Sequence, residues 1–201
     1  MEKGLMIVIS GPAGSGKGTV NTHLLAREDF VYSVSATTRA PRPGEINGIN
    51  YHFITREEFL SRIDSGDMLE YTEYCGNFYG TPLKEAQAVL ESGKNLILEI
   101  EVEGAHNVKA KYPEAVLIML LPPSFAIQEQ RLRGRGTETE EKIKARLLRT
   151  REELETANDY DYVVYNHDGC DKEAAEDILS IIRAERASVK RNAQIKEKYF
   201  S

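Results

Sequence analysis

The sequence predicts an α/β protein in which a parallel sheet is flanked by helices. Short, mostly apolar segments recur along the chain, as is typical of strands that are buried on both faces. Segments with helix start and stop signals lie between them, and strands that alternate with helices form parallel sheets. The chain has 201 residues, which suits one domain with a substantial core.

Four segments are predicted to be strands of this sheet. Each is short and lacks the alternation of polar and apolar residues that marks a strand with one face in water. They are Leu5–Ile9, Asn95–Ile100, Ala115–Leu121 and the shorter Tyr162–Tyr165.

Capping residues mark the predicted helices. Thr81 precedes Pro82, which is favoured in a first helical turn, and Gly93 stands where that helix would end. Thr55 and Glu58 have capping-box spacing at the start of a second helix.

Two longer helices are predicted in the C-terminal part of the chain. Thr137–Glu140 has capping-box spacing before a charged helix that is expected to run to about Ala157. Asp171 is expected to cap the last helix, from about Lys172 toward Ile195.

Residues 33–80 interrupt the alternation of strands and helices. They contain short strand signals, a proline- and glycine-rich loop at Pro41–Gly44, and a stretch rich in Tyr and Phe. This composition predicts a small, partly antiparallel insertion in the α/β core.

Charge and cysteine content exclude several classes of protein. Lysine and arginine total 26 and aspartate and glutamate total 32, so the net charge is −6. Such a chain is not expected to coat nucleic acid, and an anion site must be a local basic cluster. Two cysteines form no disulfide framework, and no apolar segment is long enough for a signal peptide or a membrane span. We expect a cytoplasmic protein without a nucleic-acid or membrane partner; protein partners are not indicated.

A glycine-rich loop follows the first predicted strand and matches the pattern G-x-x-x-x-G-K. Glycines let successive N–H groups turn inward around an anion, and the helix that follows adds the positive end of its dipole. Lys17 supplies a mobile charge for the β- and γ-phosphates of a nucleotide. The predicted nucleotide-binding residues are Gly11, Pro12, Ala13, Gly14, Ser15, Gly16, Lys17, Gly18 and Thr19.

Gly18 stands where this pattern usually has Ser or Thr. The hydroxyl that could bind a metal is therefore displaced to Thr19, directly or through water. We expect Mg²⁺ to accompany the nucleotide and to be held mostly by water and phosphates.

The insertion resembles the signature of guanylate kinases. The residues that carry the resemblance are Ser33–Phe53, and it continues through Gly76–Thr81, Arg131–Glu141 and Asn166. These segments occur in the family's order, span nearly the whole chain and include the phosphate loop. The resemblance implies a P-loop kinase core, a GMP-binding insertion and a mobile helical lid.

The resemblance also implies a division of one domain, residues 1–201. The core would comprise residues 1–32, 84–125 and 158–201, with the GMP-binding insertion at 33–83 and the lid at 126–157. The implied activity transfers the γ-phosphoryl group of ATP to GMP, and also to dGMP, with Mg²⁺ as cofactor. ATP and GMP are then the small-molecule partners.

Four residues of the insertion are implied to hold the 5′-phosphate of GMP. Arg39 and Arg42 flank a proline that can fix their relative position, and guanidinium groups bind phosphate with two N–H donors. Tyr51 and Tyr79 each add a hydroxyl on a rigid ring.

Guanine recognition is assigned by the resemblance to four further positions. Glu70 can accept hydrogen bonds from both N1–H and the N2 amino group of guanine, a pair of donors that adenine lacks. Ser35 and Thr81 match the family's hydroxyl positions, and Glu101 could organise either magnesium or the guanosine.

Arginines in or beside the lid complete the implied site. Arg135 and Arg146 match catalytic lid arginines, which together with Lys17 and Arg42 would neutralise the transferring phosphoryl group. Arg131 and Asn166 match positions on the ATP side, although an Asn there could equally cap a turn.

The chain departs from the family pattern at three positions. The family usually has aspartate at 101, glutamine at 103 and, often, aspartate where His167 stands. The strand that begins at Asn95 ends in Glu99, Glu101 and Glu103 at alternate positions, which predicts that all three carboxylates lie on one face at its C-terminal end, where α/β proteins bind ligands.

Three other functions stay open on the sequence alone. A non-catalytic module of this family that binds proteins is disfavoured, because such modules typically lose the phosphate loop and the arginines corresponding to Arg39 and Arg42. Glu70 and the intact insertion disfavour a P-loop kinase for another nucleotide or a phosphorylated sugar. A regulatory nucleotide switch has no feature in its favour.

Overall fold

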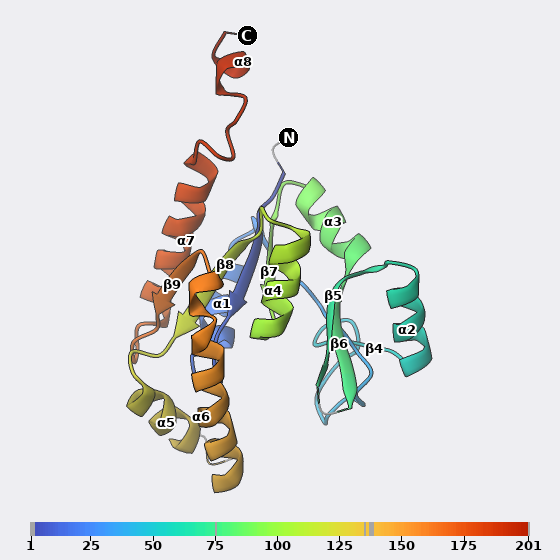
Figure 1. The fold of residues 1–201 in the computed structure, drawn as a ribbon, viewed down its shortest axis with the longest axis vertical. Coiled ribbons are helices and arrows are strands. Elements are labelled where there is room, and N and C mark those ends of the chain that lie inside the picture. The colour runs from blue at the N-terminus through green and yellow to red at the C-terminus, as the bar shows by residue number, and fades with distance from the viewer. Residues whose placement is uncertain (1–2, 75, 135, 137–138, 201) are drawn as a thin grey trace.

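The computed structural model describes residues 3–74, 76–134, 136 and 139–200. Its centre is a five-stranded sheet in which all neighbouring strands are parallel (Figure 1). In spatial order the strands are β2 (Phe30–Tyr32), β7 (Asn95–Glu99), β1 (Met6–Ser10), β8 (Val116–Leu121) and β9 (Tyr162–Tyr165). The predicted fold class and the four predicted core strands are confirmed. The fifth strand, β2, has three residues, too few for a sequence pattern to reveal it.

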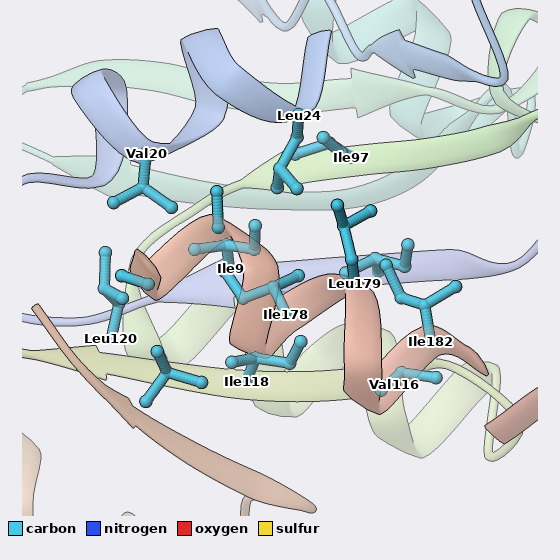
Figure 2. Packing of buried hydrophobic residues seen from close by; sticks show 14 of the residues in the cluster. Ile9, Val20, Leu24, Ile97, Val116, Ile118, Leu120, Ile178, Leu179 and Ile182 are labelled. Carbon is cyan, nitrogen blue, oxygen red and sulfur yellow. The ribbon is translucent and has the colours of Figure 1, made fainter. Parts of the chain in front are cut away.

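Helices cover both faces of this sheet because its strands are apolar on both faces. On one face of β1, Ile7 and Ile9 pack against the helices α1 (Lys17–Leu25) and α7 (Asp171–Ala187). Figure 2 shows Ile9 near Val20 of α1 and Ile178 of α7. Met6 and Val8 point the other way. They pack in a second cluster that includes residues of α3 (Leu83–Glu91) and α4 (Val102–Lys111). Burial on both faces fixes the register of β1 and hence the position of the loop that follows it.

The insertion forms a second, four-stranded sheet, and its predicted mixed character is confirmed. In order, its strands are β4 (His52–Phe53), β3 (Ala36–Thr37), β6 (Asn77–Pro82) and β5 (Met68–Tyr74). The β3–β4 pair is parallel, whereas β6 is antiparallel to both β3 and β5. Helix α2 (Arg56–Asp64) packs on this sheet through Phe59, whose ring stacks on Phe78 at 5.3 Å. Thr55 caps α2 as predicted, accepting a hydrogen bond from the Glu58 N–H.

The start of α3 differs from the prediction. Strand β6 extends to Pro82, and Pro82 rather than Thr81 is the N-cap of α3. The Thr81 hydroxyl is used elsewhere, because it donates to Glu70 across the β5–β6 pair. Gly93 follows the helix with a φ of 84°, as the predicted stop requires.

The C-terminal helices also begin and end at other residues than predicted. Helix α6 covers Glu140–Glu155 with Thr139 as its N-cap, and Thr137 and Glu138 lie outside the described residues. Helix α5 (Phe125–Gly134) precedes it, and a short 3₁₀ turn, η1 (Ala157–Asp159), follows it.

The last predicted helix is two helices. Asp171 is the first residue of α7 rather than its cap, and the N-cap is Cys170. Helix α7 ends at Ala187 because Ser188 is extended, and a separate helix, α8 (Ile195–Phe200), follows. Figure 1 shows α8 at the end of an arm that points away from the sheet. Within the described ranges, no helix is both long enough and apolar enough to cross a membrane.

The three alternating glutamates do not share a strand face, so that prediction is wrong. Strand β7 ends at Glu99, and Glu101 is the extended N-cap residue of α4. Glu103 lies in the first helical turn, where the helix dipole favours an acidic side chain. The helix starts early because Ala105 and Val108 are buried against the sheet.

Candidate functional site

The loop after β1 has a backbone that only glycine adopts easily. Gly11 has a φ of 148° and Gly16 a φ of 89°. A Cβ atom on Gly11 would lie 2.1 Å from the Leu120 carbonyl oxygen, and one on Gly16 would lie 2.3 Å from Asn166 Nδ2. Both close approaches explain why the sequence has glycine at these positions.

Lys17 is the first residue of α1 and reaches back across this loop. Its ammonium group donates to the Gly11 carbonyl at 2.5 Å and lies 3.4 Å from the Pro12 carbonyl. The charge is therefore held above the loop, at the N-terminal end of a helix, where anions bind.

Asn166 and Arg131 hold the glycine loop through hydrogen bonds to its backbone carbonyls. Asn166 Nδ2 donates to the Ser15 carbonyl at 2.9 Å. Arg131 donates to the Gly14 carbonyl at 3.2 Å and to the Asn166 carbonyl at 2.8 Å, and Asp168 holds its guanidinium at 2.6 Å. Both predicted ATP-side residues thus also have a structural role. Together with Thr19 they line a cavity of about 350 Å³ beside the loop.

A second cavity, of about 270 Å³, lies between the insertion and the core sheet, and we call it the acceptor cavity. The structure brings five of the predicted GMP-binding residues together in its wall, namely Ser35, Tyr51, Glu70, Tyr79 and Glu101. Lys17 and Thr72 also line it. The described residues of this wall do not include Arg39, Arg42 or Thr81.

Glu70 is 2% exposed and is the main buried acidic group of the acceptor cavity. Burial raises the pKa of its carboxyl group, and the hydrogen bond from Thr81 at 2.8 Å opposes that rise. Gly104, the third residue of α4, makes room for the carboxylate, since a Cβ there would lie 3.1 Å from Glu70 Oε2. Sequence reasoning missed Gly104, although a glycine inside a helix is itself a signal of close packing.

The two arginines of the proline loop are placed differently. Arg39 stacks on Tyr51 at 5.4 Å and forms a two-pronged ion pair with Glu45, with both N···O distances at 2.9 Å. Arg39 and the Arg42 backbone N–H together hold the pKa of Glu45 at about 2. Arg42 itself is exposed. Glu45 was not predicted, and it holds Arg39 in the orientation seen here.

A third cavity, of about 340 Å³, lies above the glycine loop, and we call it the phosphate cavity. Lys17, Glu99 and Glu101 line both this cavity and the acceptor cavity, so the two meet at these side chains. Arg146 of α6, one of the predicted lid arginines, lines the phosphate cavity. Arg135 lies outside the described residues.

Glu99 is held in place by two residues that sequence reasoning missed. Asn21 Nδ2 donates to Glu99 Oε2 at 2.7 Å, and the Tyr32 hydroxyl lies 3.5 Å from the same oxygen. Burial, followed by the charge of Glu99, raises the pKa of Tyr32, so its hydroxyl stays protonated. Glu99 therefore stands at the C-terminal end of β7 in a fixed orientation, where α/β proteins bind ligands.

The oxygen donors around the loop fit a magnesium ion that enters with phosphates. Glu99 and Glu101 present carboxylates to the phosphate cavity, whereas Thr19 lines the cavity beside the loop. The buried Asn21 Oδ1 and Ser15 Oγ have no hydrogen-bond partner among the described residues. Those residues contain no cluster of three or more acidic, His or Cys side chains that could cage a metal. Such a site suits Mg²⁺, which keeps water and phosphate ligands.

Comparisons of this chain with known proteins point to a single enzyme family. The guanylate kinase family model matches residues 3–185. A guanylate kinase of Halalkalibacterium halodurans is 50% identical over 94% of this chain and 93% of its own length. One of Desulfitobacterium hafniense is 47% identical over 96% of both chains. The crystal structure of guanylate kinase from Anaplasma phagocytophilum superposes with a TM-score of 0.75 at 36% identity, covering 94% of this chain and 89% of that one. The resemblance found in the sequence is thereby confirmed, and this chain belongs to the guanylate kinase family.

Proposed function

We propose that this protein transfers the γ-phosphoryl group of ATP to GMP and dGMP, forming ADP and the corresponding diphosphate. The observation that carries the proposal is that Lys17 lines both the phosphate cavity and the acceptor cavity. A donor triphosphate above the glycine loop and an acceptor monophosphate beside Tyr51 and Tyr79 would meet at its ammonium group.

The chemistry needs no general base. The attacking atom is an oxygen of the GMP phosphate, which is already anionic near neutral pH. Catalysis then depends on aligning the two phosphates and on neutralising the transferring group. Lys17 and Arg146 both line the phosphate cavity and supply positive charge to it, and Arg135 and Arg42 are proposed to join them.

Magnesium, when bound with ATP, would supply further positive charge to stabilise the transferring phosphoryl group. Glu99 and Glu101 would hold it from the end of β7 and the start of α4, and Thr19 would act through water. Asn21 and Tyr32 hold the Glu99 carboxylate, so its position is set before any ion arrives.

Guanine selection is proposed to rest on Glu70. Its ionised carboxylate can accept from N1–H and the N2 amino group together, whereas adenine has no N1 proton to donate. The Thr81 hydroxyl donates to Glu70 Oε1, so we assign Thr81 the task of orienting that carboxylate. Ser35 lines the acceptor cavity and is the hydroxyl proposed to reach the base.

The decisive experiment measures ADP release with ATP, Mg²⁺ and each of GMP, dGMP, AMP, CMP and UMP as acceptor. We expect turnover with GMP and dGMP and little with the other three. Preferential use of AMP, CMP or UMP would mean that the chain has a different acceptor. Binding of GMP without ADP release would mean that it is a non-catalytic module.

A further inference from the structure

One face of α6 presents three charged side chains to the phosphate cavity. Arg146, Arg149 and Glu153 are three and four residues apart, so they lie on the same side of the helix. Only Arg146 corresponds to a family position that the sequence identified. Arg149 and Glu153 have no role in the proposed function, yet they line the same cavity as the glycine loop.

Arg149 lies between two carboxylates. Its Nη2 is 3.3 Å from Glu101 Oε2, and its Nε is 3.1 Å from Glu153 Oε1. The Glu153 side chain is only 11% exposed. Burial and then the charge of Glu101 raise the pKa of Glu153, while Arg149 acts in the opposite direction. The guanidinium therefore helps to hold two mutually repelling carboxylates beside the phosphate cavity.

The two contacts of Arg149 differ in kind. Glu153 is four residues along the same helix and is largely buried, so this contact aims the guanidinium. Glu101 belongs to the start of α4, and its side chain is 56% exposed. Ion pairs that water reaches contribute little, whereas phosphate binds guanidinium through strong, charge-assisted hydrogen bonds. An incoming phosphate can therefore displace Glu101 without displacing Glu153.

Charge balance gives a reason for this exchange. Among the described residues that line the phosphate cavity, three cations face three carboxylates: Lys17, Arg146 and Arg149 against Glu99, Glu101 and Glu153. The side chains alone therefore give this cavity no excess positive charge, and the loop N–H groups and the dipole of α1 must supply the rest of the attraction for a triphosphate. Turning Arg149 from Glu101 to a phosphate oxygen supplies a cation and leaves Glu101 available for magnesium.

We propose that Arg149 is a further phosphate-binding residue that contacts the terminal phosphate of the donor nucleotide, and that Glu153 is its positioning residue. In the unliganded protein Glu101 holds the guanidinium at the rim of the phosphate cavity. The inference rests on the proposed placement of the triphosphate above the glycine loop.

The test uses Arg149→Ala, Arg149→Lys and Glu153→Gln in the full chain. Arg151→Ala is the matched control, because Arg151 is exposed on the same helix and stacks on Phe125 at 5.4 Å. Calorimetry measures binding of ATP and of ADP, each with Mg²⁺ and without acceptor. Steady-state kinetics with GMP gives kcat and KM for both substrates.

Loss of a charge-assisted contact to the terminal phosphate should weaken ATP binding by about tenfold to a hundredfold in Arg149→Ala. ADP binding should stay within about twofold, because ADP lacks that phosphate. We expect kcat to fall by roughly 10²-fold. Arg149→Lys should recover only part of the lost kcat, since lysine lacks the planar guanidinium that donates two parallel hydrogen bonds. Glu153→Gln should shift ATP binding in the same direction but less.

A merely structural role would weaken ATP and ADP equally, and that result would overturn the proposal. So would an Arg149→Ala variant that matches Arg151→Ala in kcat and in both affinities. Failure of the proposed function is distinguishable, because the wild-type protein would then not release ADP with GMP at all. If wild type is active and Arg149→Ala is indistinguishable from Arg151→Ala, only the role of Arg149 is wrong.

Discussion

Thr81 donates a 2.8 Å hydrogen bond to Glu70 Oε1, and both side chains are almost wholly buried. The antiparallel pairing of β5 with β6 places these two residues opposite each other. Strand pairing therefore sets the orientation of the carboxylate proposed to read guanine. The contact also explains why Thr81 does not cap the helix that follows.

Glu70→Gln should reduce kcat/KM for GMP by about 10²-fold, because a charged acceptor is lost and the amide opposes a guanine donor. AMP should be affected much less, so the GMP/AMP ratio should fall. Glu73→Gln is the matched control, since Glu73 is exposed on the same strand. An unchanged GMP/AMP ratio in Glu70→Gln would mean that guanine is read elsewhere, with Glu101 as the next candidate.

Thr81→Ala should lower kcat/KM for GMP by about 2- to 12-fold, or about 0.5–1.5 kcal/mol, because it removes a hydrogen bond that orients Glu70 and not a contact with GMP itself. Thr81→Ser keeps the hydroxyl and should restore most of the loss. Ser35→Ala should have an effect of similar size. If Thr81→Ser is as impaired as Thr81→Ala, the methyl group rather than the hydroxyl is what matters.

Gly104→Ala should impair the use of GMP without lowering the stability of the fold. A Cβ at this position would lie 3.1 Å from Glu70 Oε2, so the carboxylate must shift by a few tenths of an ångström. We expect kcat/KM for GMP to fall roughly tenfold, because small misplacements at a reacting site are costly. Alanine has a higher helix propensity than glycine, so the substitution should not destabilise α4 or lower the melting temperature. Unchanged GMP kinetics would show that the carboxylate has room to spare.

Lys17→Ala should keep the fold and lose at least about 10²-fold in kcat, since a preorganised charge donor is typically worth that much. Lys94→Ala removes an exposed lysine away from the cavities and should leave turnover unchanged. Circular dichroism checks the fold of both variants. Wild-type turnover in a folded Lys17→Ala variant would contradict the proposed meeting of the two phosphates at this residue.

The raised pKa of Glu70 predicts a pH dependence of stability. The folded protein holds this proton more tightly than the unfolded chain, so the stabilisation present at low pH is lost as pH rises through the folded pKa. Glu70→Gln has no such ionisation. Its unfolding free energy relative to wild type should therefore increase over the pH range that begins near the ordinary glutamate pKa of about 4.3 and extends to the raised pKa of the folded protein. Denaturant titrations across that range measure it, and a constant difference would mean that burial does not perturb Glu70.

Several site features could not be predicted because they depend on contacts between distant elements. Glu45 is the partner of Arg39, yet nothing in the loop sequence distinguishes it from a solvated carboxylate. Arg149 lies 48 positions from Glu101, and only the tertiary fold brings their side chains to within 3.3 Å of each other. Arg135 stays a prediction, since the described residues do not include it.

The sequence by itself determined the features that short stretches encode. Continuous apolar segments such as Leu5–Ile9 predicted the parallel core, because a strand buried on both faces needs no distant information to be recognised. The glycine loop and Lys17 were likewise local, since backbone conformation and the following helix create the anion site.

Only the tertiary structure decided where strands stop and which buried groups meet. The strand expected to reach Glu103 ends at Glu99, because burial of α4 against the sheet outweighs the local alternation of residues. Thr81, Gly104 and Glu70 meet from β6, α4 and β5. Their contact is a product of sheet register and helix packing, which are long-range properties that no local pattern contains.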